Sequence, residues 1–189
     1  MFGGGTITII IVVAIVGYAI VQYNALVRLR QMVQEAWSGI DVQLKRRADL
    51  IPNLLNTVKG YATHEQDTLK EVTEMRTRAQ GVPSGDVAGR AAAEGMLSQA
   101  LGKLFAVAEA YPDLKANENF KDLQDSLETI ESEIQMARRY YNGSAREFNV
   151  KVESFPSNLI ANQFKFEQAD YFELDDPADR AVPEVNFDK

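Results

Sequence analysis

The chain opens with an uncharged, mostly apolar run from Phe2 to Val21, which passes directly into an amphipathic, charged segment. A helix of about 20 residues rises about 30 Å, which matches the hydrocarbon core of a bilayer. The pattern therefore predicts a transmembrane anchor at residues 1–22, with the lipid bilayer as its surroundings. The apolar residues expected to hold this anchor in the membrane include Phe2, Ile7, Ile11, Val16 and Val21.

The flanks of this run favour an uncleaved anchor over a cleaved signal peptide. A signal peptide needs a basic start and a small-residue cleavage site, whereas residues 1–6 carry no charged side chain and polar residues 22–24 follow the run. Arg28 and Arg30 are the nearest basic side chains, and positive charge beside a span is retained in the cytoplasm. We expect the short N-terminus outside and the main domain in the cytoplasm.

Beyond the span, apolar residues recur at intervals of three and four, the period of one helix face. The pattern predicts a first long helix from Tyr23 to Gln80, which a Gly/Pro-containing breaker at 81–86 ends. Asp86 is a suitable N-cap for a second helix over 87–111, and Pro112 stops that helix.

The third long helix has the most regular pattern. Its apolar positions from Phe120 to Phe155 keep a three-four spacing over five heptads, which is typical of a coiled coil or helical bundle. Asn119 is expected to cap its start and Pro156 to end it, and a short helix is expected at 157–163.

These elements predict an all-α fold in which an N-terminal transmembrane helix continues into an antiparallel bundle of three long helices and a short C-terminal helix. The helical-bundle domain is expected at 23–165, with a membrane-proximal stalk at 23–54. Residues 166–189 are acidic and contain two prolines, which predicts an extended or disordered tail.

The predicted helix lengths lead to a hypothesis about assembly. The three long helices would measure about 87, 37 and 54 Å, so the second would not reach back along the stalk. Either the first helix breaks near Pro52 and folds back, or the apolar stripe of the stalk packs against other chains. The apolar phase continues across Pro52, which favours a homo-oligomer. The interface is predicted at Leu26, Val33, Trp37, Ile40 and Leu44.

Composition and motifs supply little evidence for chemistry. The net charge of −7 argues against nucleic acid as a partner, and the absence of cysteine removes thiolate chemistry. His64 is the only histidine, and no second one completes an H-E-x-x-H zinc motif. Acidic residues near Asp175 lack the spacing of a calcium loop. We therefore expect no catalytic residues, no cofactor and no metal site.

Charged residues also stand in or beside the apolar phase of the first helix, at Arg47 and Glu65. Each is costly to bury without a partner, so a buried one should pair with a charge, for example on the third helix. Alternatively, these long side chains reach solvent at the rim of the bundle. The cluster from Lys45 to Arg47 is flanked by Asp41 and Asp49 at helical spacing, which favours a solvated face over a lipid or partner site.

Two blocks of this sequence resemble a known family. They read YNALVRLRQMVQEAWSGIDVQLKRRADLIPNLLNTVKGYATHE at 23–65 and LFAVAEAYPDLKANENF at 104–120. Together with Phe155-Pro156, they resemble the signature of the LemA family of bacterial membrane proteins. The resemblance covers nearly the whole chain and implies an N-terminal helix in the bacterial cytoplasmic (inner) membrane, a small external N-terminus and a helical-bundle domain. It implies no established activity and no catalytic residues.

Three classes of function follow from these observations. The first is a membrane-anchored structural or scaffolding protein that associates through its long first helix and organises the membrane. The second is an adaptor that recruits an unidentified protein partner through its bundle or acidic tail. The third is an enzyme, for which the sequence offers neither a nucleophile and base nor a phosphate loop. We favour the non-enzymatic scaffold.

Overall fold

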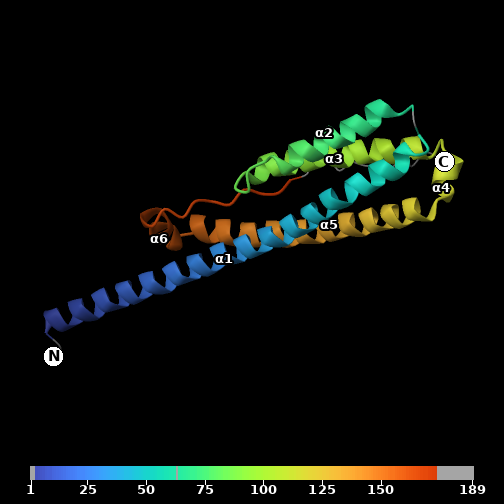
Figure 1. The fold of residues 1–189 in the computed structure, drawn as a ribbon. Coiled ribbons are helices and arrows are strands. Elements are labelled where there is room, and N and C mark those ends of the chain that lie inside the picture. The colour runs from blue at the N-terminus through green and yellow to red at the C-terminus, as the bar shows by residue number, and fades with distance from the viewer. Residues whose placement is uncertain (1–2, 63, 174–189) are drawn as a thin grey trace, which may run out of the picture. The chain divides into compact units, whose positions relative to one another are not determined.

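The computed structural model describes residues 3–62 and 64–173, which form only helices and connecting segments (Figure 1). The all-α fold predicted from the sequence is confirmed over these residues. The helices are α1 (Gly4–Lys59), α2 (Gln66–Gln80), α3 (Val87–Ala108), α4 (Pro112–Ala116), α5 (Glu118–Glu153) and α6 (Ser157–Gln163).

Helix α1 combines the apolar run and the stalk in one element. It continues through Pro52, so the alternative in which the chain folds back at this residue is wrong. A proline inside a helix removes one backbone hydrogen bond, and the helix on either side can still propagate. The apolar run and the amphipathic stalk therefore share one continuous helical backbone from Gly4 to Lys59.

The first helix ends much earlier than the predicted Gln80. After Lys59 the chain turns, with the Tyr61 and Ala62 amides both donating to the Val58 carbonyl, and α2 begins at Gln66. The apolar period continues across this turn because α1 and α2 each bury one face against the same core. Periodicity alone therefore did not reveal the break.

The ends of the later helices follow local capping chemistry. The Asp86 side chain accepts a hydrogen bond from the Gly89 amide at 2.7 Å, which confirms the predicted N-cap of α3. Asn117, rather than the predicted Asn119, accepts from the Phe120 amide at the start of α5. Pro112 begins the short helix α4, where a proline loses no helical hydrogen bond.

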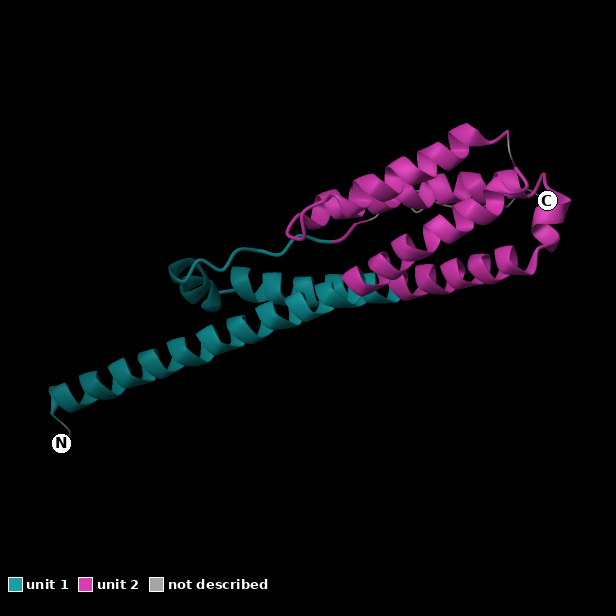
Figure 2. Ribbon diagram, viewed as in Figure 1, with its two compact units in different colours: residues 1–40, 136–171 teal, residues 41–135, 172–189 magenta. Residues whose placement is uncertain are grey.

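The chain forms two compact units, and both α1 and α5 continue from one unit into the other (Figure 2). Of the described residues, unit 1 comprises 3–40 and 136–171, and unit 2 comprises 41–62, 64–135 and 172–173. Within unit 1, the stalk part of α1 packs against the second half of α5, α6 and the segment after it. Its buried apolar residues are Leu26, Val33, Ala36, Ile40, Tyr141, Ala145, Phe148, Val152, Ala161 and Phe166.

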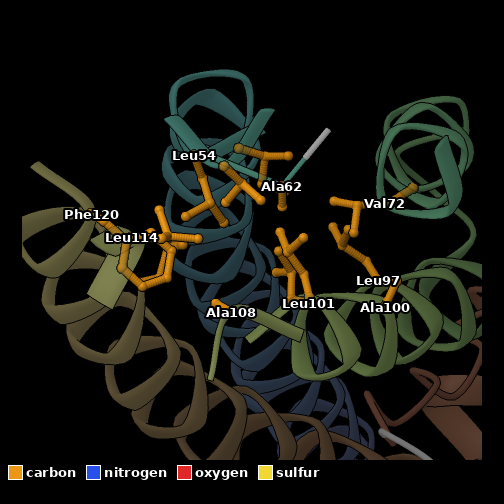
Figure 3. Packing of buried hydrophobic residues seen from close by; sticks show 14 of the residues in the cluster. Leu54, Ala62, Val72, Leu97, Ala100, Leu101, Ala108, Leu114 and Phe120 are labelled. Carbon is orange, nitrogen blue, oxygen red and sulfur yellow. The ribbon is translucent and has the colours of Figure 1, made fainter. Parts of the chain in front are cut away.

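Unit 2 has a hydrophobic core to which five helices contribute (Figure 3). The labelled residues of this core include Leu54 of α1, Val72 of α2, Leu97 of α3, Leu114 of α4 and Phe120 of α5. Burying one such side chain stabilises the fold by about 1.5–3 kcal/mol. This core joins α2 and α3, which face each other as a helical hairpin, to the outer half of α1.

The first residues of the predicted acidic tail pack against unit 1. Phe166 is buried in unit 1, and the Asn149 side chain exchanges two hydrogen bonds with the backbone of Ala169. The Tyr141 hydroxyl donates to the Asp170 carbonyl at 2.8 Å. The bundle therefore extends past the predicted boundary at 165, and the part of the predicted tail at 174–189 lies outside the described residues.

Candidate functional site

The predicted membrane anchor is an exposed apolar helix in the structure. Ile7, Ile11, Val16 and Val21 are each more than half exposed, and Phe2 lies outside the described residues. Among the described residues, α1 is the one helix that is long and apolar enough to cross a membrane. An exposed apolar surface of this size is unfavourable in water, so lipid is its natural environment.

The two arginines predicted to set the topology lie directly beyond this helix half. Both Arg28 and Arg30 belong to α1, and both side chains are exposed. The Arg30 guanidinium lies 5.0 Å from the centre of the Phe166 ring, a cation–π geometry. Their role in orienting the chain stays a prediction.

The predicted oligomer interface is covered by the chain's own helices. Leu26 and Ile40 are fully buried within unit 1, Val33 nearly so, and Leu44 is 1% exposed in unit 2. The premise that no part of the same chain covers this stripe is therefore wrong. It failed because α1 ends at Lys59, which lets the 36-residue α5 return beside the stalk.

Trp37 has an aromatic partner in the same chain. Its ring lies 5.6 Å from that of Tyr141 in an edge-to-face arrangement, and the side chain is half-buried. Burial raises the pKa of the Tyr141 hydroxyl to about 12, and the nearby Asp170 carboxylate acts in the same direction. The pair joins α1 to α5 within unit 1.

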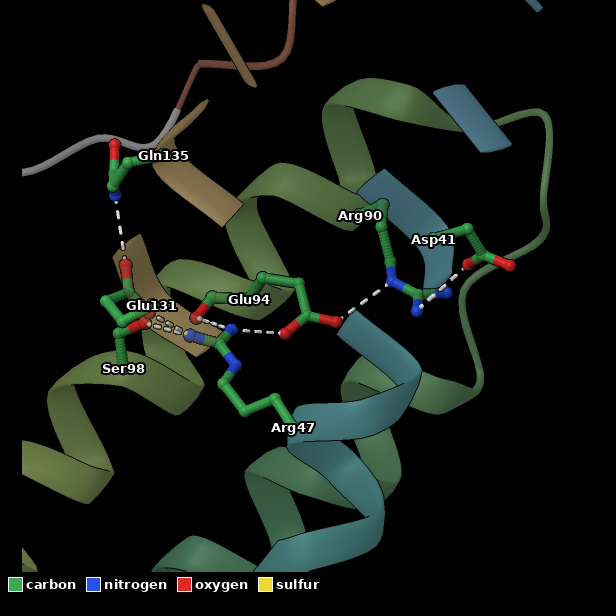
Figure 4. A network of polar contacts seen from close by, with 7 residues as sticks. All are labelled: Asp41, Arg47, Arg90, Glu94, Ser98, Glu131 and Gln135. Atoms are coloured by element: carbon green, nitrogen blue, oxygen red, sulfur yellow. Dashed lines mark hydrogen bonds and ion pairs between the residues drawn. The ribbon is translucent and has the colours of Figure 1, made fainter. Parts of the chain in front are cut away.

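Several charged side chains of unit 2 form a network of ion pairs and hydrogen bonds, part of which is buried (Figure 4). Arg47 of α1 is 3% exposed, and its Nη2 lies 2.5 Å from Oε2 of Glu94, which is equally buried. Its Nη1 lies 2.7 Å from Oε2 of Glu131 and donates to the Ser98 hydroxyl at 2.9 Å. One guanidinium therefore links α1 to α3 and α5.

Three further contacts belong to this network. Glu94 also accepts from Nε of Arg90 at 3.0 Å, and Arg90 lies 3.4 Å from the Asp41 carboxylate. Gln135 donates to the second oxygen of Glu131 at 2.9 Å. Two arginines thus face three carboxylates, so each buried charge has an opposite charge beside it.

This arrangement suits packing better than catalysis. The carboxylates of Glu94 and Glu131 are engaged by guanidinium groups, and the side chain of Arg47 is buried. Within residues 3–62 and 64–173, no three His, Cys, Asp or Glu side chains form a cluster that could hold a metal ion. The network fixes the register of three helices, a role that buried polar groups fulfil in helical assemblies.

Sequence analysis identified one end of this network and missed the other. Arg47 does pair with Glu131 on the predicted third helix, as expected of a buried charge in the apolar phase. Glu94 was not among the predicted residues, but it stands three residues before Leu97 and seven before Leu101, in their helical phase. Arg47 and Glu94 each place a charge among the apolar positions of its own helix, and these two opposite charges were the signal in the sequence that could have predicted the pair.

The remaining charged candidates lie at the surface. Arg46 pairs with Glu133 at 2.7 Å in an exposed ion pair. Glu65 is partly buried and accepts from the Tyr111 hydroxyl at 3.0 Å, and this hydrogen bond raises the pKa of Tyr111. His64 is exposed at the turn between α1 and α2.

Comparison with known proteins adds a family and several relatives. The family model described as LemA family matches residues 36–187. Magnetosome protein MamQ 2 of Paramagnetospirillum magneticum is 28% identical, and magnetosome protein MamQ of Magnetospirillum gryphiswaldense is 26% identical. Both alignments cover 88% of this chain and 70% of the relative. Protein LemA of Metamycoplasma hominis is 29% identical over 74% of this chain and 64% of its own length.

The ion network makes Arg47 a test of fold stability. Replacing Arg47 by Met leaves the buried Glu94 with Arg90 as its one arginine partner and removes the partner of the partly exposed Glu131, so the free energy of unfolding should fall by about 1.5–3 kcal/mol. The matched control is Arg46→Met, which removes an exposed pair and should cost at most about 1 kcal/mol. Urea unfolding of the detergent-solubilised full chain measures both. Equal losses for the two variants would contradict a structural role for the buried pair.

Tyr141 predicts a pH dependence. Because folding favours its neutral form, its stabilisation is complete below the ordinary pKa of 10.0 and is lost as the pH rises toward about 12. Tyr141→Phe should be less stable at neutral pH, since it loses the bond to Asp170, but should lose less stability between pH 10 and 12. Urea midpoints across that range give the slopes. The exposed neighbour Tyr140→Phe serves as control, and a slope unchanged by Tyr141→Phe would count against this assignment.

Proposed function

The chain belongs to the LemA family, and from this membership and the geometry above we propose that it is a membrane-anchored, non-enzymatic scaffold. In this proposal, α1 crosses the bilayer and carries the helical bundle at its surface. The bundle then offers a fixed platform on which chains or partner proteins assemble.

One observation carries the proposal: the exposed apolar half of α1 and its buried half form a single helix from Gly4 to Lys59. A continuous helix transmits position and orientation, whereas a flexible linker would leave the bundle free to rotate. The charges at the centre of unit 2 are committed to packing, which supports a role in binding over one in catalysis.

We assign the span to the bacterial cytoplasmic membrane, with the short N-terminus outside and the main domain in the cytoplasm. Arg28 and Arg30 support this orientation because basic residues close to a span are retained on the cytoplasmic side. The presence of magnetosome proteins among the relatives is compatible with a membrane role.

Self-association remains part of the proposal, through a different surface. The stripe from Leu26 to Leu44 is covered within the chain, so contacts between chains would use side chains that are exposed, foremost those of the span. Apolar helices in a membrane associate through close packing rather than through exclusion of water. Confinement to a plane favours such contacts.

An adaptor is the second candidate, and a groove in unit 2 favours it. The groove has a volume of about 760 Å³ between α1 and α2. Leu55 and Leu69 contribute apolar surface to it, and Lys59 and Lys70 add positive charge. Such a lining suits an acidic amphipathic segment of a soluble partner.

Topology can be read from fusions to the full chain. A fluorescent protein attached after Lys189 should fluoresce, and a periplasm-dependent phosphatase at the same site should be inactive. Replacing both Arg28 and Arg30 by Glu should increase the misoriented fraction several-fold, because the retained positive charge is lost. The control pair is Arg76→Glu with Arg78→Glu, far beyond the span along the chain. An active phosphatase on the unaltered chain would reverse the assignment.

Assembly can be measured by disulfide crosslinking, because the chain has no cysteine of its own. Single cysteines placed from Ile10 to Val21 in membrane-embedded protein should crosslink chain to chain at positions on one helix face. Cysteine at the buried Leu26 should not. Crosslinking at Leu26 alone would restore the stripe as the interface. Isolated single chains at every protein density would favour the adaptor over the scaffold.

A further inference from the structure

Three exposed apolar side chains lie in the turn after α5, within α6 and directly after α6. Phe155 is 79% exposed, Leu159 59% and Phe164 56%. Single exposed apolar residues are common, but three large ones within ten residues form a patch that usually contacts something. All three belong to unit 1, the unit that contains the transmembrane half of α1.

Contacts with α1 place this patch at the end of the span (Figure 1). The Phe164 ring lies 4.8 Å from that of Tyr23, and Tyr23 stands two residues after Val21. Two residues of helix advance about 3 Å, while the headgroup zone on each side of the hydrocarbon is about 5–7 Å thick. Phe164 is therefore level with the headgroups when the apolar run fills the hydrocarbon core.

A groove beside the patch reaches into the apolar run itself. It has a volume of about 850 Å³ and is lined by Tyr18 and Asn24 of α1 and by Phe155, Pro156 and Ser157 of the turn before α6. Tyr18 belongs to the predicted span, so one wall of the groove is membrane surface. The patch and the span are thus continuous within unit 1.

Charges in the same groove match the chemistry of lipid headgroups. Arg28 and Lys151 line it, together with one carboxylate, Glu147. Aromatic rings and long basic side chains are the residues that membrane proteins place where hydrocarbon meets headgroups, because each combines an apolar body with a polar end. The groove therefore joins apolar and phosphate-binding groups at one level.

We propose that the segment from Phe155 to Phe164 is a second membrane contact, in which Phe155 and Leu159 enter the outer part of the bilayer while Arg28 and Lys151 meet phospholipid phosphates. The occupant of the groove is a phospholipid of the surrounding membrane. This proposal rests on the proposed function, since it requires α1 to cross a bilayer. Its consequence is that unit 1 touches the membrane at two points, which restrains the tilt and rotation of the stalk.

The experiment uses spin labels on the full chain in lipid nanodiscs. Because the chain has no cysteine, Phe155→Cys and Leu159→Cys can each be labelled without other changes. Collision with oxygen, which concentrates in lipid, and with a water-soluble nickel chelate then gives the depth of each label. We expect the ratio of oxygen collisions to chelate collisions to be several-fold higher for labels at both positions than for a label at Tyr140→Cys. Tyr140 is an exposed residue in the middle part of α5.

A label at Val13→Cys, inside the span, separates the two proposals. If Val13 reports lipid while Phe155 and Leu159 report water, the second contact is wrong and the anchor stands. If Val13 also reports water, the transmembrane proposal fails with it. Labels at 155 and 159 that are shielded from both reagents would show a protein segment or a second chain over the patch, which also overturns the lipid assignment.

Discussion

The structure depends on how the chain covers the apolar stripe of its first helix. A helix that is exposed and apolar over its first half and amphipathic over its second must bury the second half against something. The turn after Lys59 and the length of α5 let the same chain do so, with Leu26 and Ile40 covered in unit 1 and Leu44 in unit 2. The anchor is therefore joined to a bundle that is complete within one chain.

Charges in the apolar phase add specificity to that burial. Hydrophobic contact is non-directional, so by itself it specifies the register of two packed helices less strictly than a paired buried charge does. Arg47 removes this freedom, since only one register brings it to both Glu94 and Glu131. A buried guanidinium without them would be strongly unfavourable. The network thus selects one arrangement of α1, α3 and α5 more than it adds net stability.

These features are the basis of the proposed scaffolding role. Within the described part of the chain, its buried ion pairs join helices, and exposed apolar side chains occur along the apolar run of α1 and at Phe155, Leu159 and Phe164. Membership of the LemA family and similarity to magnetosome protein MamQ agree with a membrane setting. In the proposed scaffold, the helix from Gly4 to Lys59 would link the bilayer to the bundle.

The sequence by itself determined the helical class, the apolar anchor, the Asp86 cap and the short helix at 157–163, because these follow from local period, length and capping. Only the tertiary structure decided where the first helix ends and what covers the stripe. The turn at Gly60 hardly disturbs the apolar period, since the residues on both sides face one core. A predicted interface between chains at Trp37 and its neighbours thereby became an interior contact with Tyr141. Likewise, Arg47 stood out in one helix, but its partner Glu94 was defined by a distance across the bundle that no local pattern encodes.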